Sequence, residues 1–233
     1  MTENKILLSI LIPTVTGRYE PFGKLISTIL NQLDTSSTMT TVLNKPPCTL
    51  IEYNHGKSDI VEIIFALDEK QMTIGEKREE LYKYANGLFS WQIDDDDSIA
   101  PNAIQLILEA IKSNTDVDCI TFEEHIDIDG KIQRSNHSLK YDDWHDNYDG
   151  YDYVRTPFMK SVIKTEIARS VPIPHIRFGE DHQWSQALKP HLKTETHIDE
   201  QIYRYIHRSS NPTERYGLDK EEKRNENSEP TNY

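Results

Sequence analysis

The sequence predicts an open α/β sheet, because apolar segments alternate with amphipathic ones and acidic residues follow two of the apolar segments. Residues 6–12 (ILLSILI) form a continuous apolar run closed by Pro13, which is typical of a buried parallel strand. Residues 61–67 and 88–93 are further apolar runs of strand length. The resulting order β-α-β-α-β-α is typical of a mostly parallel sheet flanked by helices.

Three segments with apolar residues at helical spacing follow these strands, namely residues 21–33, 74–88 and 101–111. The second of them closes with Asn86-Gly87, a common signal for the end of a helix. Residues 34–48 are polar and predict a loop, whereas residues 49–53 predict a short strand. Residues 34–60 together form a long link.

The second half of the chain has a less regular pattern. Residues 117–134 predict a strand followed by a hairpin turn at Asp129-Gly130. Residues 140–157 are acidic and aromatic without a clear period, and they predict a functional loop. Residues 178–189 predict a loop that enters a helix, and residues 200–208 predict a strand.

We expect a single domain over residues 1–218, followed by a disordered tail at residues 219–233, which are polar. Within the domain, we expect one half over residues 1–97 and another over residues 98–218.

The composition restricts the partners and the compartment. The net charge of −13 disfavours non-specific binding to a phosphate backbone or to an anionic membrane. Cys48 and Cys119 are the two cysteines and have no metal-binding spacing, as expected in a reducing cytoplasm. The apolar run near the N-terminus is too short to span a membrane and lacks the flanks of a signal peptide. We therefore expect a soluble, cytoplasmic protein.

Four consecutive aspartates, Asp94–Asp97, follow the predicted strand at residues 88–93. In open α/β sheets ligands bind at the carboxyl ends of the strands, where Asp68 also lies. Two carboxylates about 5 Å apart repel by roughly 3 kcal/mol at an effective dielectric of about 20, so the run needs solvent, a helix N-terminus or a cation. Oxygen ligands two residues apart suit Mg²⁺ or Mn²⁺. A solvated loop is the alternative interpretation of the run by itself.

The chain resembles the family 2 glycosyltransferases of the GT-A fold over roughly residues 6–210. The segments that carry the resemblance occur in the family's order, and they are SILIPTVTGR, TILNQ, GEKREELYKYANGLFSWQIDDDD, FGEDHQW and YRYIHRSSNPT. The DXD motif alone is weakly specific, whereas the ordered set is more specific. The resemblance implies a GT-A (Rossmann-like) fold, with a mostly parallel sheet flanked by helices. Residues 1–97 would then be the nucleotide-binding half, and residues 98–218 a more irregular half on the acceptor side.

The resemblance also implies site residues. The nucleotide-sugar-binding residues would be Thr14, Arg18, Asp68, Lys77, Arg78, Asp94 and Asp95. The general base would be Asp181, with Glu180 as the next candidate. The ligands of an Mn²⁺ or Mg²⁺ ion would be Asp94, Asp96 and His207, but the quartet leaves the frame open, and Asp95 with Asp97 is the other choice. The chain departs from the family's pattern at Glu79, where the family usually has an asparagine that contacts the nucleotide. It also departs in residues 34–60, which are longer than the family's usual link and which we interpret as an acceptor or oligomerisation element.

The implied activity is inverting, metal-dependent transfer of a sugar from a nucleoside diphosphate sugar to an acceptor hydroxyl. UDP is the nucleotide that we expect. The alternatives are a nucleotidyltransferase and a non-catalytic module that binds a nucleotide or a metal on the same fold. Release of a nucleoside diphosphate, release of pyrophosphate and absence of turnover would separate the three.

The sequence is compatible with two classes of acceptor. A glycan is one candidate, and a hydroxymethylated base in phage-type DNA is another, so nucleic acid would be an acceptor substrate only. For DNA the chain offers a basic groove built from Lys131, Arg134, Lys140, Arg155 and Lys160. For a sugar, Trp144 in the polar segment is the best aromatic platform.

Overall fold

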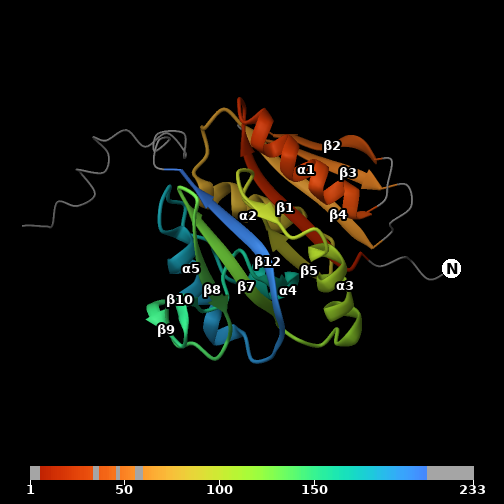
Figure 1. The fold of residues 1–233 in the computed structure, drawn as a ribbon. Helices are drawn as coiled ribbons and strands as arrows, with labels where there is room; N and C mark the ends of the chain where they lie inside the picture. The colour runs from red at the N-terminus through yellow and green to blue at the C-terminus, as the bar shows by residue number, and fades with distance from the viewer. Residues whose placement is uncertain (1–5, 34–36, 46–47, 56–59, 209–233) are drawn as a thin grey trace, which may run out of the picture.

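Helices cover both faces of a mixed sheet (Figure 1). The computed structural model describes residues 6–33, 37–45, 48–55 and 60–208. In this part of the chain one sheet contains twelve strands, ten of which follow the order β2-β3-β4-β1-β5-β11-β7-β8-β10-β9, while β6 and β12 lie off this path.

The three apolar runs predicted as parallel strands are parallel neighbours. β1 (Leu8–Val15) lies between β4 (Val61–Asp68) and β5 (Phe89–Gln92). The register pairs Val15 with Asp68, so β1 and β4 end at the same edge of the sheet. The aspartates that follow β5 therefore emerge beside the end of β1.

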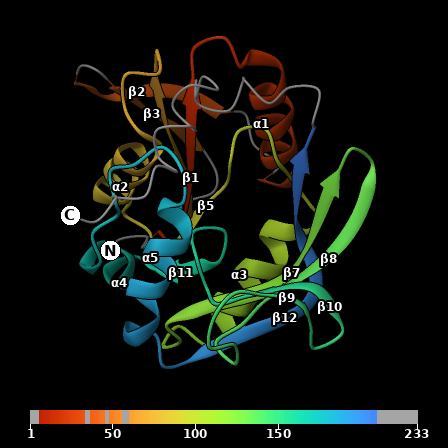
Figure 2. The same ribbon diagram turned by 90° about the vertical axis from the view of Figure 1, so that its left-hand side faces the viewer.

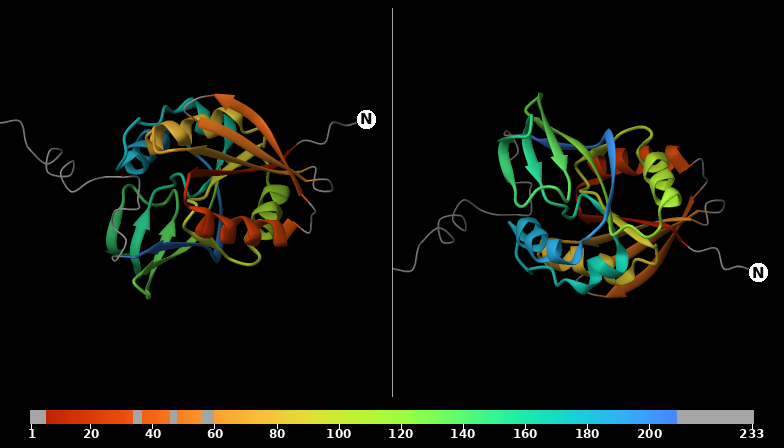
Figure 3. Two further views of the ribbon diagram at one scale, coloured as in Figure 1. Left: turned by 90° about the horizontal axis from the view of Figure 1, so that it is seen from above. Right: turned by 90° about the horizontal axis from the view of Figure 1, so that it is seen from below.

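The alternation of side chains along β1 divides the core into two layers. Leu8, Ile10 and Ile12 pack with α1 (Tyr19–Leu33) and α3 (Ala103–Ser113). On the other face, Leu11 belongs to a layer built with α2 (Ile74–Tyr84), α4 (Thr165–Ser170) and α5 (Glu180–Leu188). The 3₁₀ helix η1 (Lys189–His191) follows α5. The views from above and below show α1 and α3 opposite α2 (Figure 3).

The strands of the second half extend the sheet. β7 (Cys119–Ile128) and β8 (Lys131–His137) form the hairpin predicted at Asp129-Gly130, where both residues have positive φ. β11 (Val162–Lys164) joins β7 to β5. The long β12 (Glu195–His207) runs parallel to β7 (Figure 2) and pairs with the short β6 (Ser98–Ile99). Because β6 directly follows the aspartates, this pairing brings the end of β12 to the acidic loop.

Three predictions about secondary structure were wrong. Residues 34–48, predicted as a loop, contain β2 (Ser37–Lys45), which forms a hairpin with β3 (Cys48–His55) on the edge of β4. Residues 140–157, predicted to be irregular, contain the hairpin β9 (His145–Tyr148) and β10 (Tyr151–Arg155). Helix α2 ends at Tyr84, two residues before Asn86-Gly87, because Ala85 already has an extended conformation.

No helix in the described part of the chain is long and apolar enough to cross a membrane. The predicted tail at residues 219–233 lies outside the described residues.

Candidate functional site

Asp95 ties the acidic loop to the end of β1. Its carboxylate accepts hydrogen bonds from Oγ1 of Thr14 at 2.6 Å and from Nη1 of Arg18 at 2.5 Å. The side chain is 1% exposed, and burial raises the pKa of this carboxyl to about 6, against the lowering effect of the Arg18 guanidinium. Thr14 and Asp95, both predicted to contact the nucleotide, thus lie beneath the surface and contact each other.

Asp97 ties the same loop to β12. It accepts hydrogen bonds from the hydroxyl of Tyr203 at 2.7 Å and from the backbone nitrogen of Ile206 at 2.8 Å. Lys160 lies 3.3 Å from its Oδ2 atom. The Asp97 side chain is fully buried, and burial raises its pKa to about 7.

Asp94 faces α2 and α5 through Arg78. The guanidinium of Arg78 donates to Oδ1 of Asp94 at 2.9 Å, to Oε1 of Gln92 at 3.0 Å and to Oε1 of Glu180 at 3.2 Å. Burial raises the pKa of Glu180, and the Arg78 guanidinium opposes this rise. One buried arginine therefore fixes the acidic loop relative to the first turn of α5.

Asp96 has the most exposed carboxylate of the four, because its side chain is 27% exposed and that of Asp94 is 18% exposed. Nη1 of Arg18 lies 3.3 Å from Oδ2 of Asp96. The structure therefore separates the quartet into two buried carboxylates, one that is held by Arg78, and one that reaches the surface beside Arg18.

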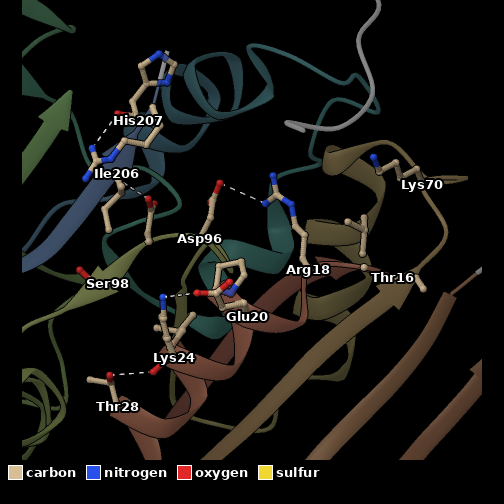
Figure 4. A pocket seen from close by; sticks show the side chains of 16 residues that line it. Thr16, Arg18, Glu20, Lys24, Thr28, Lys70, Asp96, Ser98, Ile206 and His207 are labelled. Carbon is tan, nitrogen blue, oxygen red and sulfur yellow. Dashed lines mark hydrogen bonds and ion pairs between the residues drawn. The ribbon is translucent and has the colours of Figure 1, made fainter. Parts of the chain in front are cut away.

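Asp96 lies in a pocket of about 700 Å³ at the carboxyl end of β1, and Figure 4 shows the Arg18 guanidinium directed at it. His207, at the end of β12, also lines this pocket. The charged residues of the lining are Arg18, Lys24, Lys70, Arg208, Glu20, Asp96 and Asp97. Four of these are basic and three are acidic, so the pocket is less acidic than a chain with a net charge of −13.

Asp96 and His207 are the residues of this lining that could hold a divalent cation together with a phosphorylated ligand. In the described residues no group of three or more His, Cys, Asp or Glu side chains is arranged to hold a metal by itself. Mg²⁺ and similar ions are commonly held by one or two carboxylates, while phosphate oxygens and water complete the coordination. Asp96 and His207 line the pocket, whereas Asp94, the third predicted ligand, is bound to Arg78 outside the lining.

Asp68 and Lys77 form a fully buried ion pair below the pocket. Nζ of Lys77 lies 2.5 Å from Oδ1 of Asp68 and 2.8 Å from the carbonyl oxygen of Thr14, and both charged side chains are 0% exposed. The second carboxylate oxygen of Asp68 accepts from the backbone nitrogen of Met72 at 2.8 Å. In this structure the pair orients the strand ends and exposes no side-chain atom to a ligand.

The two candidate bases differ in their surroundings. Glu180 is buried on Arg78, whereas Asp181 is half-buried and its Oδ1 accepts from the backbone nitrogen of His182 at 2.8 Å. Gly179 precedes them with φ of +79°, a conformation that costs glycine little, and begins α5. Asp181 is therefore connected to the acidic loop through Glu180 and Arg78.

Four of the five cations considered for a DNA-binding groove are paired with carboxylates. Arg134 pairs with Glu123, Lys140 with Asp149, Arg155 with Asp146, and Lys160 with Asp97 and Glu124. The remaining residue, Lys131, lies exposed at the start of β8. Trp144, the predicted platform, is half-buried, with the Arg155 guanidinium 4.8 Å from its ring centre.

Two residues of this network were not predicted as parts of the site. Tyr203 bridges Asp97 and the backbone nitrogen of Asp94, and Gln92 holds Arg78. Lys160 was considered only for the groove. A lysine in the apolar stretch PFMKSVI is the sequence signal that could have indicated a buried ion pair, since lysine is rarely buried unless it is paired.

The sequence matches no protein-family profile and no curated protein. Among solved structures, the chain is similar to S. aureus TarS residues 1–349, with a TM-score of 0.57 and 12% identity over 86% of this chain and 60% of that chain. The complex of the same TarS segment with UDP-GlcNAc gives a TM-score of 0.56 and 12% identity over 85% of this chain and 58% of that chain. HddC from Yersinia pseudotuberculosis gives a TM-score of 0.44 and 9% identity over 89% of this chain and 97% of that chain. The chain thus spans about 60% of the TarS segment, and the likeness to TarS confirms the predicted GT-A fold.

Proposed function

We propose that this protein is a glycosyltransferase that uses a nucleoside diphosphate sugar. The observation that carries the proposal is the pocket at the carboxyl end of β1, which Arg18, Asp96 and His207 line together. Arg18, with Lys24 and Lys70 in the same lining, supplies positive charge for a diphosphate in an otherwise acidic protein. The fold shared with TarS, which was crystallised with UDP-GlcNAc and with UDP, supports a UDP-sugar as the donor.

We further propose that Mn²⁺ or Mg²⁺ binds with the donor. Asp96 and His207 are the protein groups that would hold the ion, and diphosphate oxygens and water would complete its coordination. The chemistry that the ion supplies when bound is neutralisation of the charge that develops on the leaving diphosphate. The frame of the DXD motif that this proposal uses is Asp94 and Asp96, since Asp95 and Asp97 are buried on Arg18 and Lys160.

The remaining steps belong to side chains of this protein. Arg18 would orient the diphosphate from the end of β1, and Asp181 would accept the proton of the acceptor hydroxyl. Attack from the face opposite the diphosphate gives inversion at the anomeric carbon. The contacts of Arg78 with Asp94 and Glu180 would keep the base and the donor in a fixed relation.

A glycan is the acceptor that we favour, because four of the five cations considered for DNA are paired with carboxylates. The buried pairs around the acidic loop are compatible with nucleotidyl transfer as well, and the product distinguishes the two reactions. With UDP-GlcNAc as the donor, sugar transfer releases UDP, whereas nucleotidyl transfer from UTP releases pyrophosphate.

The experiment that tests the proposal is a thermal-shift series with UDP, in Mn²⁺ and in EDTA. A ligand that binds the folded state raises the melting temperature, and we expect a rise with UDP and Mn²⁺ but little rise with UDP and EDTA. Asp96→Ala should abolish the metal-dependent part of the rise. The matched variant Asp95→Ala should retain more of that rise, although it lowers the melting temperature of the free protein. Equal shifts in Mn²⁺ and EDTA would contradict the proposed site.

A further inference from the structure

An exposed aromatic side chain precedes the candidate base by three residues in the sequence. Four large hydrophobic side chains are exposed in the described part of the chain, namely Tyr19, Ile132, Tyr148 and Phe178. Phe178 is 74% exposed and lies three residues before Asp181. Single exposed apolar side chains are common in soluble proteins. Phe178 differs in how its segment is held and in which side chains follow it.

The segment around Phe178 is fixed at both ends to elements of the candidate site. On one side, Nη2 of Arg177 donates to the carbonyl oxygen of Lys70 at 3.3 Å, and Lys70 lines the donor pocket. On the other side, Glu180 forms its 3.2 Å ion pair with α2. Gly179, with φ of +79°, makes the turn between them. The backbone therefore holds Phe178 outside the core on a segment that is anchored at two points.

A second aromatic group lies on the other side of Asp181. The ring centre of His182 lies 4.9 Å from that of Trp144. Polar side chains lie next to His182, since Oδ1 of Asp143 is 3.4 Å from its Nε2 atom and accepts a hydrogen bond from Nε2 of Gln186 at 2.8 Å. The candidate base is thus flanked along the chain by Phe178 and by a cluster of aromatic and polar side chains.

We propose that Phe178 is a stacking wall for the acceptor and that the acceptor is a neutral pyranose unit of a glycan. A pyranose has an apolar C–H face that stacks on an aromatic ring, and a rim of hydroxyls that need polar partners. The carboxylates of Asp143 and Asp181 disfavour an anionic acceptor at this position. An open-chain polyol lacks the flat apolar face and would gain less from Phe178.

This inference rests on the proposed glycosyltransferase function. In the transfer step the acceptor oxygen forms a bond to the anomeric carbon, and the bond from that carbon to the diphosphate oxygen breaks. The diphosphate leaves with the electron pair, and Asp181 takes the hydroxyl proton. Phe178 takes no part in these bond changes and would act only on the position and affinity of the acceptor.

The test compares Phe178→Ala with Phe178→Tyr, Ile132→Ala and Tyr148→Ala. The donor is UDP-GlcNAc with Mn²⁺, and the probes are the methyl glycosides of glucose, galactose and N-acetylglucosamine, with glycerol and ribitol as polyols. UDP release is measured with each probe and with water alone. In Phe178→Ala we expect KM for the best glycoside to rise several-fold, up to about 10-fold, the effect of losing one aromatic contact. UDP release in water and the melting temperature should not change.

Retention of the wild-type KM in Phe178→Tyr and in the two control variants would support the inference, because these variants keep an aromatic ring at position 178. An unchanged KM in Phe178→Ala would overturn it. A lower melting temperature with an unchanged KM would overturn it as well, since Phe178 would then be covered by another part of the protein. Equal use of polyols and glycosides, or UDP release that no glycoside accelerates, would refute the pyranose assignment. Absence of both UDP binding and UDP release would instead refute the proposed function itself, and the inference with it.

Discussion

Nζ of Lys160 lies 3.3 Å from Oδ2 of Asp97 and, on its other side, 3.1 Å from Oε1 of Glu124. The lysine is 12% exposed, and both carboxylates are buried. The ring of Tyr205 on β12 lies 3.9 Å from the same ammonium group. One cation therefore joins the acidic loop, β7 and β12, which are the elements that position Asp96 and His207.

Lys160→Met should strongly destabilise the protein, because it leaves Asp97 and Glu124 buried without their shared cation. Loss of one partner from a buried ion pair costs about 3–5 kcal/mol, and we expect a decrease of this size in the free energy of unfolding measured in urea. The matched variant Lys131→Met, at an exposed lysine on β8, should change it by about 0.5 kcal/mol or less. Adding Asp97→Asn and Glu124→Gln to Lys160→Met should restore part of the loss. Similar stabilities of Lys160→Met and Lys131→Met would refute the role given to Lys160.

Glu124 should make stability depend on pH in the acid range. Burial would raise its pKa, but Lys160 and Nε2 of His137, 3.0 Å away, outweigh burial and hold the pKa at about 2. A carboxyl whose pKa is lower in the folded state stabilises the protein above its unfolded pKa of about 4.3 and loses this contribution as the pH falls toward about 2. The free energy of unfolding should therefore decrease over this range, and Glu124→Gln should have a smaller slope. A variant with the wild-type slope would contradict the assignment.

The sequence predicted the buried strands of the first half because a continuous apolar run indicates a buried strand even when its neighbouring strands are not known. It failed at β2 and β9, which lie at the two ends of the main strand order. Edge strands have a neighbour on one side only and tolerate polar residues, so their sequences look like loops. Two signals were nevertheless present, a threonine-rich composition in residues 37–45 and the Asp149-Gly150 turn, where both residues have positive φ.

The location of the candidate site was also readable from the sequence, since residues at the carboxyl ends of neighbouring strands meet at one edge. The orientation of each aspartate was not. It depends on Arg18, Arg78 and Lys160, which lie far from the quartet in the sequence and reach it only through the fold. This is why alternation along the chain left two frames for the DXD motif. In the structure Asp96 has the most exposed carboxylate of the four, which is why the proposed function uses the frame that contains it.

Gly75→Ala should destabilise the junction between α2 and the segment that leads to α5. A Cβ atom at Gly75 would lie 1.9 Å from the carbonyl oxygen of Pro174, a backbone atom that cannot move aside alone. The matched variant Gly23→Ala, exposed in α1 with nothing within 4 Å of the added atom, should raise the free energy of unfolding by about 0.4–1 kcal/mol. Thermal unfolding of both variants measures the contrast. If Gly75→Ala did not change the thermal stability, α2 and this segment would pack less closely than described.

Asp181→Asn should slow sugar transfer without weakening donor binding. Asparagine keeps the size of the side chain but cannot accept the proton of the acceptor hydroxyl. We therefore expect transfer slower by about 10²–10⁴, the usual contribution of a general base, with UDP affinity within a few-fold of wild type. Asp181 is half-buried, and within the described residues its carboxylate receives a hydrogen bond only from the backbone of its neighbour, so the melting temperature should change little.

Glu180→Gln is the matched control, because it makes the same chemical change one residue earlier. Glu180 is buried on Arg78, and the loss of its charge weakens the link from α5 to Asp94. This variant should lower the melting temperature and weaken UDP binding together, which Asp181→Asn should not do. Near wild-type transfer by Asp181→Asn would exclude Asp181 as the base. If Glu180→Gln then abolished transfer while its UDP affinity and melting temperature stayed normal, the base role would pass to Glu180.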